Sequence, residues 1–218
     1  MSRRPFSWAA SVVCLVVVAC GGTQDPDPEI PTAEPSASAA KPKREKPKCL
    51  AFTENCVSTA DTQAKIPGSE AVFIPPVGWT YAQQTDATLT QIEGSAAVIA
   101  LAGFDSAPAD EAKTRDSLYA KLLQIVELSP PEKFKKKYTP KWDKADQERE
   151  NGNMKVKLWQ AESAKRTGKS GFLLVLTTTD PAGKKIVGVA FSPDGDESSI
   201  EKISKALETI GPADWSRP

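Results

Sequence analysis

The residues of this chain with the widest possible chemistry are its cysteines, because a thiolate can attack an electrophile, bind a metal or form a disulfide. The chain has 218 residues, with four cysteines, Cys14, Cys20, Cys49 and Cys56, and no histidine. Histidine is the commonest metal ligand and a frequent general base. Its absence excludes catalytic sets of the Ser-His-Asp and Cys-His types. Modification and disulfide formation are therefore the chemistry expected of the cysteines.

Two stretches have the composition of ligand-binding loops without their spacing. In "TGKSGF" (167–172), the glycine that a Walker loop needs five positions before Gly168 is Ser163, and a strand pattern follows instead of a helix. We predict a hairpin loop there. In "PDGDES" (193–198), an Asp-x-Asp pair lacks the glutamate that completes a calcium loop, so we predict a turn and a helix cap. The chain is predicted not to be an enzyme and to use no metal and no cofactor.

The N-terminal residues have the three parts of an export signal. Arg3 and Arg4 supply positive charge, and Trp8 to Ala19 form an apolar run of 12 residues. A helix needs about 20 apolar residues to span a bilayer. We therefore predict that residues 1–19 are a processed signal peptide and not a membrane span.

The end of the apolar run, Val17-Val18-Ala19-Cys20, resembles the lipobox of bacterial lipoproteins, with valine in place of the usual leucine. The resemblance implies that a peptidase cuts before Cys20 and that its sulfur carries a diacylglyceryl group. Two or more acyl chains hold a protein stably at a membrane. The residue after Cys20 is Gly21 and not aspartate, which by the same resemblance favours the outer over the inner membrane. The expected location is the bacterial cell envelope.

A tether is predicted to follow the lipidated cysteine over residues 20–48. Six of the 25 residues from 24 to 48 are proline, and no apolar period is visible. Such a composition is typical of an extended, disordered linker.

Cys49 and Cys56 remain as a pair once Cys14 leaves with the signal and Cys20 is lipidated. An even pair in an oxidising compartment indicates a disulfide, and the spacing C-x₆-C is not the C-x-x-C of redox or zinc sites. We predict a structural disulfide that closes a small loop within residues 49–65. A free reactive thiol is the alternative.

Residues 66–212 have the apolar patterns of one globular domain, followed by a tail at 213–218. Two helices are predicted. The first lies within 106–131, with Ser106 as its cap and an apolar stripe from Ala112 to Val126. The second lies within 196–211, with Ser198 and Glu201 as a capping box. A Gly-Ser hairpin joins two of the strands, and the run at 171–179 is predicted to be a central strand buried on both faces. The elements predict an α+β fold with a largely antiparallel sheet. The predicted strands are 70–76, 87–93, 96–102, 153–162, 171–179 and 184–191.

The stretch "FIPPVGWTY" (73–81), with the hairpin, the middle helix and the closing strand and helix, resembles the PsbP-like fold over about residues 66–211. Pro75, Gly78 and Trp79 form most of the motif. This superfamily includes extrinsic photosystem proteins, a nuclear-transport factor and many bacterial lipoproteins. The resemblance implies an α/β/α sandwich and an accessory or binding role, and it supplies no active-site residues.

Lysines and aromatic residues are interleaved in "EKFKKKYTPKWDK" (132–144). Such a segment can bind an anionic polymer by charge and stacking. Its aromatic residues also fall every four positions, which would pack one helix face against the core and leave the lysines in solvent. Both interpretations stay open. The candidate patch consists of Lys133, Phe134, Lys135, Lys136, Lys137, Tyr138, Lys141 and Trp142.

The charge of the chain is balanced, with 28 basic and 28 acidic residues, which predicts no binding of nucleic acid. The sequence as a whole predicts a membrane-anchored extracytoplasmic lipoprotein. Its domain is expected to act as a non-enzymatic accessory that binds a protein partner of the envelope. The alternative is a binder of anionic envelope polymer through Lys133–Lys144, which strong salt dependence of binding would identify.

Overall fold

The computed structural model describes residues 49–129, 139–151 and 154–213. All of them belong to one unit, which starts at Glu45. Residues 1–48, with the predicted signal peptide, Cys20 and linker, lie outside the described residues, as do residues 214–218. None of the helices in the described part of the chain has the length and apolar character needed to cross a membrane.

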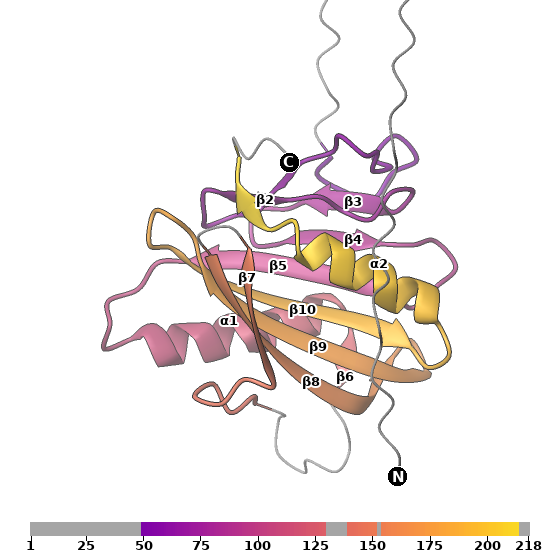
Figure 1. The fold of residues 1–218 in the computed structure, drawn as a ribbon. Helices are drawn as coiled ribbons and strands as arrows, with labels where there is room; N and C mark the ends of the chain where they lie inside the picture. The colour runs from indigo at the N-terminus through magenta and orange to yellow at the C-terminus, as the bar shows by residue number, and fades with distance from the viewer. Residues whose placement is uncertain (1–48, 130–138, 152–153, 214–218) are drawn as a thin grey trace, which may run out of the picture. The chain divides into compact units, whose positions relative to one another are not determined.

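The described residues form a large antiparallel sheet in the order β3-β4-β5-β10-β9-β8-β6, with β7 also paired to β8 (Figure 1). Its strands are β3 (Thr80–Gln83), β4 (Thr88–Gln91), β5 (Val98–Phe104), β6 (Leu128–Ser129), β7 (Gln147–Asn151), β8 (Met154–Arg166), β9 (Lys169–Thr179) and β10 (Lys185–Pro193). A smaller antiparallel sheet has the order β1-β2-β11. It is formed by β1 (Ala64–Lys65), β2 (Ala71–Phe73) and β11 (Gly211–Pro212).

Two helices, α1 (Glu111–Ile125) and α2 (Glu197–Leu207), lie on opposite faces of the large sheet (Figure 1). Tyr119 and Leu122 of α1 belong to the apolar core on one face. Ile203 and Leu207 of α2 belong to the core on the other face, which the small sheet also covers. Successive side chains of a strand point to opposite faces, so β10 contributes to both cores. The predicted α+β class, largely antiparallel sheet and two helices are confirmed.

Both predicted hairpins are present, but the first has a longer loop than predicted. The pairing of β4 with β5 ends at Gln91 and Val98, so the loop that contains Gly94 and Ser95 spans residues 92–97. β8 and β9 pair across Thr167 and Gly168. Thr167 and Gly168 have φ angles of +48° and +79°, as the tight turn of a two-residue hairpin requires. The "TGKSGF" stretch is therefore a hairpin loop, as predicted.

Two predicted details of burial are wrong. Phe172 and Leu174 on β9 are only half-buried, although this strand is interior to the sheet and was predicted to be buried on both faces. The reason is that both side chains line an open groove between the sheet and α2. Ala112, predicted to lie on the apolar stripe of α1, is exposed in the first turn of the helix.

Both helices begin at residues other than the predicted caps. α1 starts after a turn in which Asp110 N donates to Ala107 O, which leaves Ser106 in the preceding loop. At α2 the cap is Asp196 and not Ser198, because the turn at Gly195, with φ of +79°, places the Asp196 side chain at the helix start. Asp196 Oδ1 accepts from Ser199 N at 3.0 Å. "PDGDES" is thus a turn and a cap, as predicted.

Replacing Asp196 with alanine is expected to lower the free energy of unfolding by about 1 kcal/mol, because the Ser199 amide loses its acceptor. Hydrogen bonds from Ser199 hold the pKa of Asp196 below its ordinary value of 3.8. A lowered carboxyl pKa stabilises the fold above the ordinary value, and this stabilisation is lost as the pH falls through the folded-state pKa. Urea titrations from neutral pH to well below 3.8 measure both effects.

The matched control is Ser198→Ala, which removes the hydroxyl of the residue predicted from sequence to be the cap. It is expected to leave the free energy of unfolding nearly unchanged at every pH. A deficit for Asp196→Ala that stayed constant down to the lowest pH would contradict the proposed role of the ionised carboxylate.

Candidate functional site

Cys49 and Cys56 form a disulfide-compatible pair, with Cα atoms 5.6 Å apart and both side chains buried. The loop between them is bonded to β3 at both ends. Gln83 N donates to Cys49 O at 2.6 Å, and Tyr81 N donates to Cys56 O at 2.9 Å. The closed loop therefore covers the edge of the large sheet at its first strand, where an exposed edge would be open to unwanted pairing.

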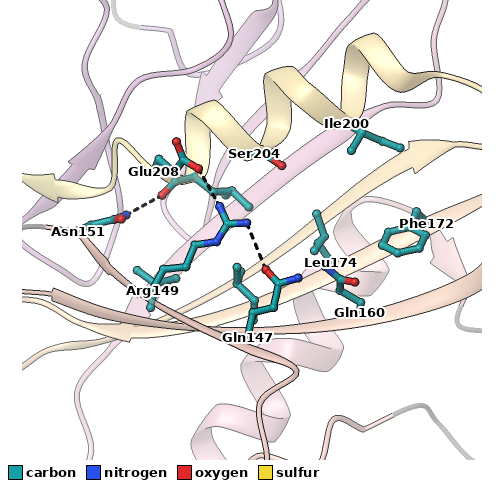
Figure 2. Close-up of a pocket in the computed structure, with 12 residues that line it drawn as sticks. Gln147, Arg149, Asn151, Gln160, Phe172, Leu174, Ile200, Ser204 and Glu208 are labelled. Carbon is teal, nitrogen blue, oxygen red and sulfur yellow. Dashed lines mark hydrogen bonds and ion pairs between the residues drawn. The ribbon is translucent and has the colours of Figure 1, made fainter. Parts of the chain in front are cut away.

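A groove opens between α2 and strands β8 and β9, with a volume of about 270 Å³ (Figure 2). Leu158, Leu174 and Phe172 line it from the sheet, and Ile200 and Leu207 line it from the helix. Phe172 and Leu174 are half-buried, and 38% of Ile200 is exposed. The groove is thus an apolar surface that the domain itself leaves partly uncovered.

The end of the groove beside β7 is polar and is held together by three hydrogen bonds (Figure 2). Arg149 donates to Glu208 at 2.7 Å and to Gln147 at 3.2 Å. Asn151 Nδ2 donates to the backbone carbonyl of Leu207 at 3.2 Å. These contacts join β7 to the C-terminal end of α2. Because the side chains of Arg149 and Glu208 are 42% and 53% exposed, the ion pair contributes only about 0–1 kcal/mol, so a ligand can displace it at little cost.

The predicted lysine and aromatic patch lies mostly outside the described residues. Lys133 to Tyr138 are not described, whereas Lys141 and Trp142 are. Residues 139–146 form turns and not the helix that one of the two interpretations of this segment assumed. Pro140 accounts for this, because proline removes a backbone donor and disfavours helical geometry in the residue before it.

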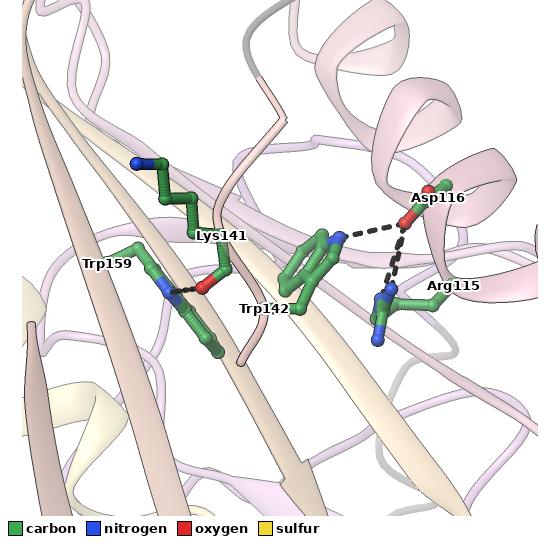
Figure 3. Close-up of polar contacts among 5 residues, drawn as sticks. All are labelled: Arg115, Asp116, Lys141, Trp142 and Trp159. Atoms are coloured by element: carbon green, nitrogen blue, oxygen red, sulfur yellow. Dashed lines mark hydrogen bonds and ion pairs between the residues drawn. The ribbon is translucent and has the colours of Figure 1, made fainter. Parts of the chain in front are cut away.

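Trp142 packs against the α1 face of the sheet, although it does so from a turn (Figure 3). Its ring meets those of Tyr119 and Trp159 edge to face, with centroids 5.7 and 5.1 Å apart. Its indole Nε1 donates to Asp116 Oδ1 at 2.8 Å. The Arg115 guanidinium lies 4.4 Å from the ring centroid. The Trp142 ring therefore packs within the domain, while the side chain of Lys141 is exposed.

The ionisable groups with shifted pKa values do not form an acid–base set. Hydrogen bonds from lysine lower the pKa of Asp105, through Lys184, and of Glu201, through Lys205. Burial lowers the pKa of Arg166, whose guanidinium donates to backbone carbonyls. None of these residues lines the groove. Within the described ranges, His, Cys, Asp and Glu form no group of three that could hold a metal ion.

No protein-family model and no curated protein shows significant similarity to this chain. The groove was not predicted from the sequence. Its sequence signal is the apolar run of β9, from which Phe172 and Leu174 line the groove.

Replacing both Cys49 and Cys56 with serine is expected to lower the free energy of unfolding by about 2.5 kcal/mol, the loop-entropy value for a ring of eight residues. Urea titration of the oxidised protein and of the double variant measures the difference. Adding a reductant should destabilise the parent protein and leave the variant unchanged. Alkylation of Cys49 and Cys56 in the native protein without reductant would show that the bond is absent.

Proposed function

We propose that this chain is a membrane-anchored extracytoplasmic lipoprotein whose domain binds a protein partner of the cell envelope and catalyses no reaction. The anchor is supported by the lipobox-like stretch that ends at Cys20 and by the proline-rich segment that follows it. Lipid on Cys20 would hold the domain at the bacterial envelope, at the outer membrane in preference to the inner. The binding role rests on one observation, the apolar groove between α2 and strands β8 and β9.

A PsbP-like fold is part of the proposal. It is supported by helices on opposite faces of a largely antiparallel sheet. The residues of the PsbP-like motif have a structural role here. Trp79 is fully buried and its amide donates to Pro76 O at 3.0 Å, in a turn that contains Gly78 with φ of +82°. The motif thus fits a packing function and adds no catalytic group.

The lining of the groove favours a protein partner. Apolar surface from Phe172, Leu174 and Ile200 is bordered by the polar side chains of Gln147 and Gln160. An apolar centre with a polar rim is the usual anatomy of a protein interface, in which a few buried anchor side chains supply most of the affinity.

The test is photo-crosslinking in native envelope membranes, with the full chain carrying a photoreactive residue in place of Ser204, which lines the groove. The control carries the photoreactive residue in place of Lys205, which is exposed and does not line the groove. We expect one protein adduct from Ser204 and none from Lys205. Equal adducts from both positions would contradict the proposed site.

A charge placed in the groove should abolish the adduct. Ile200→Lys is expected to reduce the yield from position 204 at least tenfold, because a lysine there must be desolvated by an apolar partner. Val77→Lys is the matched control, since Val77 is 61% exposed and lies outside the groove. An undiminished adduct with Ile200→Lys would overturn the proposal.

Binding of an anionic envelope polymer through Lys133–Lys144 remains the second proposal. The described part of that segment contributes the exposed Lys141 and Lys144, and its Trp142 packs inward. An adduct from Ser204 that persists at high salt favours the protein partner, because salt weakens interactions between exposed charges that lie farther apart than the Debye length, which is about 10 Å at 0.1 M and shorter at higher salt.

A further inference from the structure

A second recess lies on the α1 face of the sheet, with a volume of about 260 Å³. It lies where β8 begins, β9 ends and β10 begins. Four basic side chains from three elements line it, and Glu111 is the one acidic residue among the described residues that do so. The basic residues are Arg115, Lys155, Lys157 and Lys185.

The strand register explains why these side chains gather on one face. Lys157 lies opposite Thr177, and Lys185 lies opposite Thr179. Lys155 is two residues before Lys157, so it points to the same face. Paired residues of neighbouring strands share a face, and so lysine ammonium groups and threonine hydroxyls alternate across the recess.

Arg115 brings a fourth cation to the recess from the first turns of α1. Its side chain is 20% exposed, and the contact with the Trp142 ring fixes the guanidinium over the sheet (Figure 3). It pairs with the carboxylate of Asp116 at 3.3 Å. A guanidinium held in this way loses little conformational entropy when it binds an oxyanion.

Two of the four cations have no carboxylate partner within the described part of the chain. Among the described residues, Lys185 Nζ donates only to Thr179 Oγ1, at 3.2 Å. Lys155 lies opposite Glu150 on β7, but no ion pair joins their side chains. Lys157 has a long ion pair, 3.6 Å, with Glu148. The recess therefore offers lysines that an added anion can bind without first breaking a strong pair.

We propose that this recess binds a phosphate monoester group, carried either by a soluble metabolite or by a lipid headgroup. A doubly charged phosphate fits the chemistry because lysine ammonium groups, an arginine fork and hydroxyl donors together can satisfy its oxygens. The site is independent of the groove. Val156 and Leu158 of β8 line the groove on one face, while Lys155 and Lys157 line the recess on the other.

Isothermal titration of the full chain carrying Cys20→Ser, which cannot take a lipid, tests the site with two probes. The first is glycerol phosphate in solution. The second is the same phosphate group displayed as phosphatidic acid in zwitterionic vesicles, with the zwitterionic vesicles alone as baseline. The test variant is Lys155→Gln/Lys185→Gln. The control variant, Lys113→Gln/Lys202→Gln, removes equal charge from exposed positions outside the recess.

We expect the test variant to lose at least tenfold in affinity for the probe that binds, and the control variant to keep the parent affinity. Binding of glycerol phosphate supports a soluble ligand, and binding only to phosphatidic acid vesicles supports a headgroup. Binding of neither probe, or equal loss in both variants, overturns the proposal. Urea titration of both variants shows whether they fold, and Lys155→Gln alone, at an exposed position, serves if the double variant does not.

Discussion

The alternation of side chains along β8, β9 and β10 is the constraint on which the rest of the structure depends. β10 is buried along nearly its whole length and supplies apolar side chains to both cores. A sheet that is apolar on both faces must be covered on both, which the two helices and the small sheet accomplish. Gly188 shows how close this packing is, because a Cβ there would approach Leu101 Cδ2 to 2.4 Å.

The same alternation gives one strand two different roles. On β8, Met154, Val156 and Leu158 belong to the core beneath α2. Lys155 and Lys157, between them, face the α1 side, where the apolar packing ends at Trp142. The two surfaces thus differ in chemistry but share a backbone. A shift of this strand by one residue would exchange the two sets of side chains, so the register at Lys157 and Thr177 must be kept for both surfaces at once.

The elements that could be predicted from the sequence are those governed by local pattern. Period-two stretches such as 153–162 and the hairpin around Gly94 and Ser95 depend on neighbouring residues. Both are present close to their predicted positions, although the hairpin loop is longer than predicted. The cap of α2 was misplaced by two residues, because a serine and an aspartate are both good caps and the turn at Gly195 selects Asp196. The groove could not be predicted, because the exposure of Phe172 and Leu174 depends on where α2 packs on the sheet. The basic recess likewise depends on register between strands.

The disulfide-compatible loop also determines how the domain would carry a mechanical load. A pull from the N-terminal side enters the described domain at Cys49. With the ring closed, tension would pass through the sulfur atoms to Cys56 and leave the six residues between them slack. It would then reach Ser58, whose amide donates to Trp79 O at 2.8 Å. The disulfide would thereby carry the load past Cys49, so that rupture of the Cys49 hydrogen bond would not lengthen the chain, and the hydrogen bonds of Cys56 and Ser58 at the sheet edge would bear the tension.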